Sequence, residues 1–275
     1  MTDFDDSVLS RDGFLGGRLR LWQPRRGYRA GVDPVLLAAA VPARAGQSVL
    51  ELGCGAGAAI LCLAARVPGL EATGVELQPG YAALARRNAA DNDLGLEVIC
   101  ADLAALPAEL RRRQVDHVIA NPPYYRAGAH TRAADSGRAV ALGEAETPLA
   151  LWLEVAARRL APRGMLHMIQ RTERLPEILA ACAGRLGSLE VLPLAARAGR
   201  APDLVILRAR KGGRAAFRLH APLLLHQGAC HGQDREDYAP EIAAVLRHGA
   251  ALVWPETNGA RAPSRRGHDG NVSLL

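Results

Sequence analysis

A glycine-rich segment between an apolar run and a helical pattern is the feature that most restricts how this chain can fold. Residues 47–52 are apolar enough for a buried parallel strand, residues 53–57 read Gly-Cys-Gly-Ala-Gly, and residues 58–66 have a helical pattern. That order of segments predicts a site where a ligand approaches bare backbone. Together with Ala58 the loop also satisfies the dinucleotide fingerprint G-x-G-x-x-G/A, so the loop alone does not identify its ligand.

Two carboxylates follow later segments of the same kind. Residues 71–76 are predicted as a strand that ends in Glu76, about 20 residues past the loop, where a ribose-binding acid is expected. Residues 96–100 are predicted as a third strand, and Asp102 follows it. An acid there can accept the exocyclic amine of an adenine ring. An aspartate after a strand also often caps a helix, and the sequence leaves both roles open.

Residues 121–124 read Asn-Pro-Pro-Tyr and follow the apolar run 115–120. The side-chain oxygen of Asn121 and the carbonyl of Pro122 can each accept one N–H of a planar amino group, which aims its delocalised lone pair. The prolines stiffen this turn, and Tyr124 can stack on a planar substrate. The segment therefore predicts a site that acts on an amino nitrogen. The alternative is an Asn-Pro turn that only ends a buried strand.

In their order along the chain, these segments resemble the motifs of class I S-adenosylmethionine-dependent methyltransferases that act on amino nitrogens. An N-terminal block resembles a narrower family, the bacterial tRNA adenine N6-methyltransferases that modify adenine 37, beside the anticodon, in a valine tRNA. The similarity covers residues 10–250, and Ala30, Val32 and Pro34 depart from the family pattern. The matching segments are residues 14–24, 27–33, 50–57 and 75–76, Asp102, and residues 121–124.

The resemblance implies an α/β, Rossmann-like class I methyltransferase fold with a mostly parallel, doubly wound, seven-stranded sheet whose last strand is antiparallel. It implies S-adenosyl-L-methionine as cofactor and direct in-line methyl transfer to the exocyclic amine of a tRNA adenine. Catalytic roles fall on Asn121, Pro122 and Tyr124. Cofactor-binding roles fall on Tyr28, Arg29, Gly31, Glu51, Gly53, Gly55, Gly57, Glu76, Leu77, Asp102, Leu103 and Asn121.

Alternating strand and helix patterns in the second half of the chain support the doubly wound sheet. The four motif positions then fall at the carboxyl ends of the strands, where ligands bind in such sheets. The predicted elements are a helix over residues 149–160, a strand over 164–170, a helix over 174–185, and a strand pair over 189–194 and 204–209.

The charge distribution favours RNA as the partner. The net charge is +6, residues 18–29 hold arginines without any acid, and the arginines of residues 197–218 are interrupted only by Asp203. Such runs suit RNA phosphates. Solvated faces also carry charge, and Lys211 is the only lysine, which indicates a coding bias toward arginine. Substrate or RNA binding is predicted for Pro123, Tyr125, Arg126, Arg25, Arg26, Arg208, Arg210 and Lys211, with residues 125–146 as a substrate loop.

The length of 275 residues favours one large core with extensions. We expect an N-terminal extension with a helix over the cofactor pocket, a methyltransferase domain, a C-terminal extension and a disordered tail. Asp33, followed by Pro34, is interpreted as the N-cap of the early helix rather than as a catalytic group. The four parts are residues 1–46, 47–210, 211–254 and 255–275.

Five cysteines without a C-x-x-C pair favour a reducing cytoplasm, and neither a targeting segment nor a membrane span is predicted. We expect a monomer. His226, Cys230 and His231 lack the ligand pairing of zinc motifs, so no metal site is predicted. His167, inside a predicted strand, is interpreted as a core histidine with satisfied hydrogen bonds.

Three alternatives remain open. A methyltransferase of the same fold could act on guanine N2 in ribosomal RNA or on a glutamine amide in a protein. A nicotinamide-dependent oxidoreductase would use the same glycine loop. A non-catalytic RNA-binding protein would use the arginine runs alone.

Overall fold

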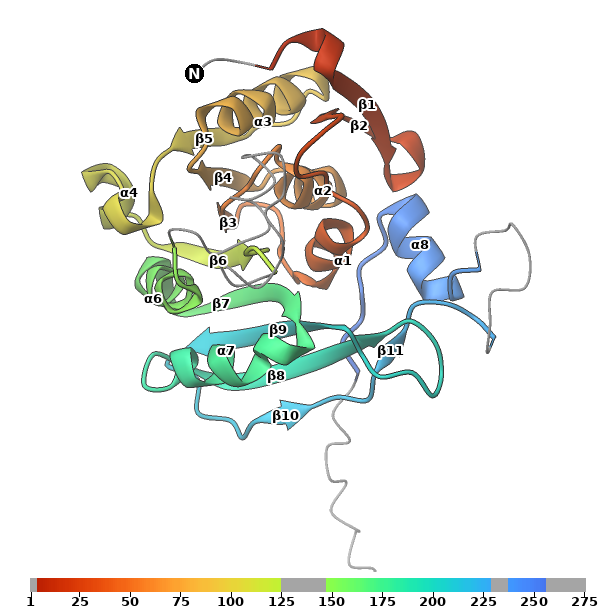
Figure 1. The fold of residues 1–275 in the computed structure, drawn as a ribbon. Coiled ribbons are helices and arrows are strands. Elements are labelled where there is room, and N and C mark those ends of the chain that lie inside the picture. The colour runs from red at the N-terminus through yellow and green to blue at the C-terminus, as the bar shows by residue number, and fades with distance from the viewer. Residues whose placement is uncertain (1–3, 125–146, 229–236, 256–275) are drawn as a thin grey trace, which may run out of the picture.

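A mostly parallel sheet organises the chain (Figure 1). The computed structural model describes residues 4–124, 147–228 and 237–255. Within them the sheet has nine strands in the order β10-β8-β9-β7-β6-β3-β4-β5, with β11 also paired to β8. The strands are β3 (Ser48–Leu52), β4 (Glu71–Glu76), β5 (Glu97–Cys100), β6 (Val115–Ala120), β7 (Leu160–Arg171), β8 (Leu186–Ala195), β9 (Leu204–Lys211), β10 (Arg218–Leu219) and β11 (Leu223–Leu224).

The predicted fold class is confirmed. Strands β5, β4, β3, β6 and β7 are parallel neighbours, and β9 runs antiparallel between β7 and β8. These and β8 are the expected seven strands, with the last one antiparallel. The two-residue strands β10 and β11 were not expected, and both run parallel to β8 at the edge of the sheet.

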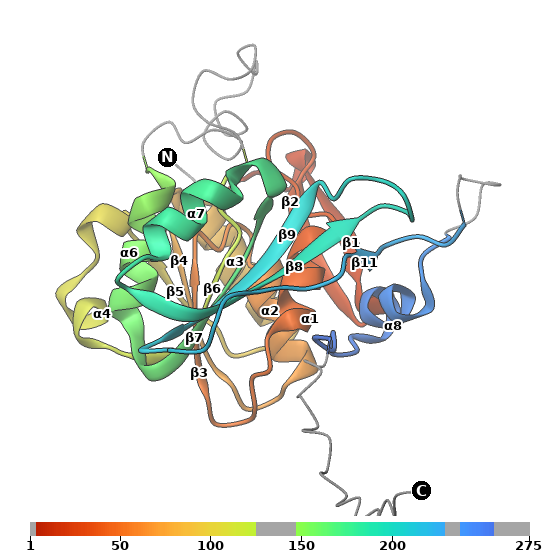
Figure 2. The ribbon, with the colours of Figure 1, turned by 90° about the horizontal axis from the view of Figure 1, so that it is seen from below.

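Helices cover both faces of the sheet (Figure 2). Because side chains alternate along a strand, neighbouring residues enter different cores. Val49 of β3 packs in the core that contains α1 and α2, whereas Leu50 packs in the core that contains α6 and α7. The helices are α1 (Asp33–Ala40), α2 (Ala58–Arg66), α3 (Pro79–Asp91), α4 (Ala108–Arg112), α6 (Leu149–Arg159), α7 (Leu175–Cys182) and α8 (Pro240–His248).

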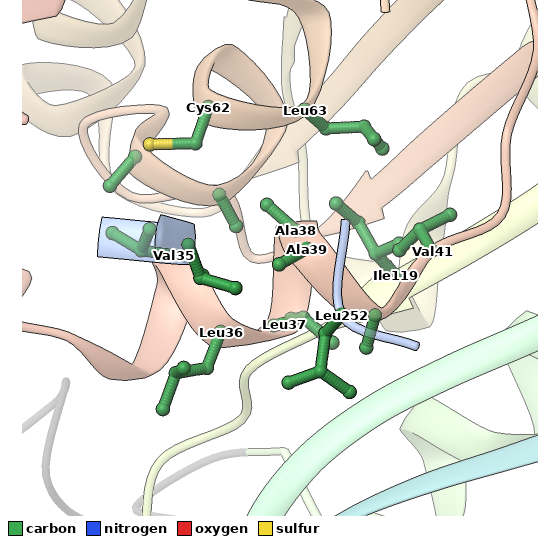
Figure 3. Packing of buried hydrophobic residues seen from close by; sticks show 14 of the residues in the cluster. Val35, Leu36, Leu37, Ala38, Ala39, Val41, Cys62, Leu63, Ile119 and Leu252 are labelled. Carbon is green, nitrogen blue, oxygen red and sulfur yellow. The ribbon is translucent and has the colours of Figure 1, made fainter. Parts of the chain in front are cut away.

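Helix α1 is buried on all sides, from Pro34 to Ala40. Figure 3 shows its residues against Ile119 of β6 and against Leu252 of the C-terminal segment. The Leu252 amide donates to the Ala39 carbonyl at 2.9 Å, and the Trp254 indole donates to the Ala40 carbonyl at 3.0 Å. One core therefore includes residues from both predicted extensions, and the proposed four-part division stays a prediction.

An N-terminal hairpin that the sequence did not reveal lies beside α3 (Figure 1). It consists of β1 (Leu9–Phe14) and β2 (Leu19–Pro24). The Asn88 side chain accepts from the Trp22 amide at 2.7 Å and donates to the Trp22 carbonyl at 3.0 Å. Asn92, one helical turn later, makes the same pair of bonds with Arg20 at 2.9 and 2.8 Å. Asn88 also donates to the Ala56 carbonyl at 2.9 Å, so it joins the hairpin to the glycine loop.

Several predicted elements match the structure residue by residue, namely α2, β4 and β6. Strand β7 is longer than predicted at its amino end, and α7 is shorter than predicted. The helix stops before Gly184, whose φ of 72° is left-handed and incompatible with its continuation. In the described part of the chain, no helix combines the length and apolar character needed to cross a membrane.

Candidate active site

Four motif positions meet at the carboxyl edge of the sheet, as predicted. Gly53 follows β3, Glu76 ends β4, Asp102 follows β5 and Asn121 follows β6. Their strands are adjacent in the order β6-β3-β4-β5. The arrangement places a glycine loop, two carboxylates and an amide beside one another.

The glycine loop takes a backbone conformation that side chains would strain. Gly53, Gly55 and Gly57 have φ angles of 62°, 55° and 87°. A Cβ at position 53 would lie 2.4 Å from Cη2 of Trp152, so the loop has no room for a side chain there. Gly53 and Gly55 are half-exposed. Their backbone is accessible to a ligand at the amino end of α2.

Glu76 is held by backbone amides on both carboxylate oxygens. Oε2 accepts from the Gly55 amide at 2.8 Å, and Oε1 accepts from the Gln78 amide at 2.9 Å. Burial raises the pKa of Glu76, and these backbone bonds oppose the rise. Each oxygen keeps a further lone pair, which can accept a sugar hydroxyl. Leu77, the next residue, is 37% exposed beside it.

Glu51 lies in β3, directly before the glycine loop, and binds the helix that follows the loop. It is buried, and its Oε2 accepts from the Ile60 amide in the first turn of α2 at 3.0 Å. Burial raises the pKa of Glu51 well above its ordinary value, and the charge of Glu76 raises it further. The structure therefore shows Glu51 joining β3 to α2. Its predicted contact with a cofactor stays a prediction.

Asp102 caps a turn, one of the two roles that the sequence left open. Its Oδ1 accepts from the Ala104 amide at 2.8 Å, at the start of the 3-10 turn Leu103–Ala105. Leu103 is buried under that turn. The cap fixes Asp102 at the sheet edge without using its second oxygen, so the adenine contact stays a prediction.

Asn121 and Tyr28 link the Asn-Pro-Pro-Tyr turn to the glycine loop. Asn121 Nδ2 donates to the Tyr28 hydroxyl at 3.3 Å, and a Cβ on Gly55 would lie 3.7 Å from the Tyr28 ring. Burial raises the pKa of Tyr28, as do the negative charges of Asp33 and Glu51. Asn121 Oδ1 is buried and has no hydrogen-bond partner among the described residues. That atom is the acceptor that the motif chemistry requires.

Tyr124 donates its hydroxyl to Asp33 Oδ2 at 2.6 Å. The interpretation of Asp33 as an N-cap is wrong, because Val32 occupies the N-cap of α1 and the Asp33 side chain makes no capping bond. Tyr124, which is distant in sequence, binds the Asp33 carboxylate that the local pattern had assigned to the N-cap of the helix. Burial and the Asp33 carboxylate raise the pKa of Tyr124, so its hydroxyl is neutral at physiological pH.

Gln170 holds the two prolines of the motif, and it was not identified as a site residue from the sequence. Its Nε2 donates to the carbonyls of Pro122 at 3.3 Å and Pro123 at 3.2 Å. Gln170 is fully buried and is the last but one residue of β7. Its polar side chain directly after the apolar pair Met168 and Ile169 was the signal that could have indicated it.

The comparisons with known proteins decide the family. The model of the methyltransferase small domain matches residues 31–190. The chain belongs to the methyltransferase small-domain family. It is an S-adenosylmethionine-dependent methyltransferase, so the nicotinamide-dependent and non-catalytic alternatives are wrong.

Relatives of this methyltransferase carry a narrower name. A Porphyromonas gingivalis protein named tRNA1(Val) (adenine(37)-N6)-methyltransferase is 32% identical, over 54% of this chain and 61% of its own length, which is less than two thirds. An Aeromonas hydrophila protein of the same name is 30% identical, over 73% of this chain and 84% of its own length.

Solved structures share the fold of the methyltransferase. A predicted O-methyltransferase from Agrobacterium tumefaciens aligns with a TM-score of 0.66 and 29% identity, over 80% of this chain and 98% of that one. The Thermus thermophilus 16S rRNA N2 G1207 methyltransferase, in complex with AdoMet and guanosine, aligns with a TM-score of 0.52 and 21% identity, over 74% of this chain and 50% of that one.

The residues of the methyltransferase fit its cofactor. S-adenosylmethionine has a sugar with two hydroxyls and a positively charged sulfur. Glu76 presents lone pairs suited to the hydroxyls, and the negative charge of Asp33 acts on the Tyr28 hydroxyl beside the loop. An acidic surrounding stabilises a bound cation. Glu76 and the glycine-loop backbone are therefore the groups that would hold the cofactor, and these roles stay predictions.

Trp152 also borders this part of the methyltransferase and was missed. Its ring occupies the space beside Gly53, and its indole Nε1 is buried without a hydrogen-bond partner in the described part of the chain. Trp152 lies on the apolar side of α6 among core residues, so its sequence position did not distinguish it from them. Gly31 is exposed ahead of α1.

The predicted RNA-binding residues of the N-terminal run have two placements. Arg25 and Arg26 are exposed between β2 and Tyr28. Arg29 instead donates to Asp12 at 2.7 Å and Ser10 at 2.8 Å, on the hairpin. Its guanidinium therefore braces the segment that carries Tyr28, and its predicted contact with the cofactor is not favoured by this placement.

The predicted residues of β9 lie away from the site. Arg208 makes two bonds of 2.9 Å with Glu190 and lies 4.2 Å over the Trp254 ring. Arg210 pairs with Met165 near the amino end of the parallel part of β7, and Lys211 donates to the Leu160 carbonyl at 2.6 Å. Because β9 is antiparallel, its later residues approach the opposite edge of the sheet. This geometry does not favour their predicted contact with the substrate.

Arg171 is a basic residue at the correct edge, and the sequence did not single it out. It ends β7, directly after Gln170. Its positive charge acts on the Tyr124 hydroxyl and partly offsets the rise in the pKa of Tyr124. Tyr125, Arg126 and the predicted substrate loop 125–146 lie outside the described residues, as do Cys230 and His231.

His167 is buried, as predicted, but only one of its ring nitrogens has a partner among the described residues. Nε2 lies 3.4 Å from Nδ1 of His117, and Nδ1 has none. His226 contacts Asp237 at 2.6 Å and stacks on Tyr238. None of these contacts involves residues 121–124.

Proposed function

We propose that this methyltransferase transfers a methyl group to the exocyclic N6 of an adenine in tRNA. The observation that carries the proposal is the buried Asn121 Oδ1, which has no partner among the described residues and lies in an Asn-Pro-Pro-Tyr turn. A buried acceptor without a donor costs free energy, and a substrate amine can supply that donor. The name shared by the relatives from Porphyromonas gingivalis and Aeromonas hydrophila supports adenine and tRNA.

The turn offers two acceptors to one amino group. Asn121 Oδ1 accepts one N–H, and the Pro122 carbonyl accepts the other with the lone pair that Gln170 does not use. Held in this way, the nitrogen loses part of its conjugation with the ring and its lone pair becomes available. When bound, S-adenosylmethionine supplies a methyl group on a positively charged sulfur. The nitrogen lone pair forms the new N–C bond as the S–C pair returns to sulfur, and the excess proton leaves to water.

The aromatic ring of Tyr124 supplies the face on which the adenine stacks. Its hydroxyl is engaged by Asp33, which fixes the ring beside the turn. Stacking on an aromatic ring is the usual way in which proteins hold an unpaired base. A base in a single-stranded loop is extruded at a lower free-energy cost than a base in a duplex, which suits an anticodon loop.

Positive charge on two sides of the turn supports RNA over a protein amide. Arg25 and Arg26 are exposed on the N-terminal side, and Arg171 lies on the β7 side near Tyr124. Phosphates that flank an extruded base would face such groups. A glutamine amide in a protein brings no such charge.

Guanine N2 in ribosomal RNA is the second candidate. The Thermus thermophilus enzyme that acts on such a guanine has a similar fold, and its amine is likewise attached to a planar ring. The motif geometry does not distinguish the two rings. Adenine is favoured because the relatives with sequence similarity carry that name.

The test uses the full chain with labelled S-adenosylmethionine and, in separate reactions, bulk tRNA, ribosomal RNA and total protein. We expect label in the tRNA fraction and N6-methyladenosine by mass spectrometry of its nucleosides. N2-methylguanosine in the ribosomal RNA fraction, or label confined to protein, would replace the proposal with one of the alternatives.

A further inference from the structure

Gln170 is a fully buried side chain whose amide is used almost completely. Nε2 lies 3.3 Å from the Pro122 carbonyl oxygen and 3.2 Å from the Pro123 carbonyl oxygen, and Oε1 accepts from the Arg171 amide at 2.8 Å. An amide nitrogen has two N–H donors, so the two carbonyls account for both. This arrangement requires a donor group at the end of the side chain.

The turn has few other means of attachment. Prolines lack a backbone N–H, so the carbonyls of Pro122 and Pro123 are the only backbone polar groups through which this part of the motif can be held. The ladder between β6 and β7 ends at the pair Ala120 and Met168. The motif therefore begins where backbone pairing stops. Gln170 lies two residues beyond that pair and continues the connection with its side chain.

Gln170 is itself fixed from the other side. Its backbone pairs with Val205 of the antiparallel strand β9. The sheet thus holds Gln170, and Gln170 holds the turn. A displacement of the Pro122 carbonyl would misdirect the second acceptor of the substrate amine, and misplacement by about 1 Å can cost on the order of 100-fold in rate.

We propose that Gln170 is a positioning residue for methyl transfer, whose amide orients the Pro122 carbonyl toward the N–H of the substrate amine. This inference rests on the proposed function in taking an amine as the acceptor. It concerns the alignment of that amine and applies equally to an adenine or a guanine. Gln170 makes no contact with substrate in this scheme and acts through the turn.

The first test replaces the donor without changing the length of the side chain. Gln170→Met should lower kcat by about 10- to 100-fold, because the Pro122 carbonyl loses its fixed direction. The dissociation constant for S-adenosylmethionine should change less than about threefold, because Glu76 takes its hydrogen bonds from the Gly55 and Gln78 amides and not from Gln170. Gln47→Met is the matched control, since Gln47 accepts from the Arg44 amide at the opposite edge of the sheet, and it should leave kcat unchanged.

The second test uses a group whose donor capacity depends on pH. A protonated Gln170→Glu side chain has one O–H that can donate to a proline carbonyl, whereas the ionised carboxylate would face two carbonyl oxygens and repel them. The ratio of kcat of the variant to that of the wild type should therefore rise as the pH falls from about 8 to 6. A purely structural role would give a ratio that follows the folded fraction, measured by circular dichroism in the same buffers.

Three outcomes overturn the inference. Full kcat in a folded Gln170→Met variant is the first, and a pH-independent ratio for Gln170→Glu is the second. The third is a loss of kcat that matches the loss of folded protein. Failure of the proposed function is seen separately, because wild-type protein would then give no methylated nucleoside from RNA. The variant ratios are measured on whichever amine the wild type methylates.

Discussion

The hydroxyl of Tyr124 donates to the carboxylate of Asp33 across 91 positions of sequence, at 2.6 Å. The bond joins the motif after β6 to the first turn of α1. It also occupies the only polar group of the Tyr124 side chain. The part of Tyr124 left to face a substrate is its ring.

We therefore expect Tyr124→Phe to retain most activity and Tyr124→Ala to lose it. Stacking on an aromatic side chain contributes about 1–3 kcal/mol per base, so the alanine variant should lose on the order of 10- to 100-fold in kcat/KM. Tyr124→Phe should stay within about fivefold. Steady-state kinetics with the RNA substrate measure both, and equal losses in the two variants would show that the hydroxyl, rather than the ring, contacts the substrate.

Asn121→Ala should abolish transfer while cofactor binding persists. Removal of one group that is aligned on a reacting centre typically costs about 100- to 1000-fold in kcat. Glu76 takes its hydrogen bonds from the Gly55 and Gln78 amides and none from Asn121, so calorimetry should give a dissociation constant for S-adenosylmethionine within a few-fold of wild type. A variant with wild-type kcat would contradict the role of Oδ1 as an acceptor.

Glu76→Gln should weaken the cofactor without changing its chemistry. A hydrogen bond to a charged group contributes about 1.5–3 kcal/mol, so the dissociation constant should rise by about 10- to 100-fold. At saturating S-adenosylmethionine, kcat should recover to near the wild-type value. Glu71→Gln is the control, because Glu71 is exposed at the other end of β4. An unchanged dissociation constant for Glu76→Gln would show that another group holds the ribose.

Arg171→Glu should weaken RNA binding much more than Arg210→Glu. Arg171 ends β7 beside the motif, whereas Arg210 pairs with Met165 toward the opposite edge. Each lost phosphate contact reduces the slope of log affinity against log salt by about 0.7 for single strands. Filter binding of tRNA across a salt series measures that slope. Equal effects of the two substitutions would restore the interpretation that β9 contacts RNA.

Acid should destabilise the protein through His167. Burial holds the pKa of His167 well below its ordinary value and also lowers the pKa of its neighbour His117. Above the pKa of a histidine in the unfolded chain, about 6.5, both histidines are neutral in the folded and in the unfolded state, and the free energy of unfolding does not change through them. Below about pH 6.5 these histidines become protonated in the unfolded chain but stay neutral in the folded chain. The free energy of unfolding therefore falls by up to about 1.4 kcal/mol per pH unit for each histidine, until the pH reaches the pKa of the folded state.

Urea denaturation between pH 8 and 5 measures this slope. His167→Leu should reduce it by about one proton, and exposed His248→Gln should leave it unchanged. A His167→Leu variant that keeps the wild-type slope would assign the acid sensitivity to other groups.

Local patterns identified most of the sheet, because β4, β6 and α2 are made of residues whose periodicity matches their final burial. The hairpin was missed for a physical reason. It is held by side chains of Asn88 and Asn92, 66 and 72 positions from their partners in β2. Such attachments cannot be read from the hairpin sequence, although β2 itself alternates between buried Leu19 and Leu21 and exposed Arg20.

The candidate site shows the same division between local and distant causes. The glycine loop, Glu76 and Asn121 were found because strand ends and turn residues are local signals. Asp33 was misread because the local N-cap pattern was satisfied while its actual partner, Tyr124, is remote. Arginines of β9 were assigned to RNA because their run is interrupted by a single acid, although the antiparallel direction predicted for that strand directs its later residues to the opposite edge of the sheet.

The contact between Trp254 and Ala40 spans 214 positions. Helix α1 is therefore among the earliest parts of the chain to be synthesised and among the last to be enclosed. On the ribosome the part of its surface that Leu252 and Trp254 cover stays exposed until residue 254 has emerged, which leaves time for association with other chains. Expression yield and the need for chaperones should accordingly depend on a tryptophan far from the active site.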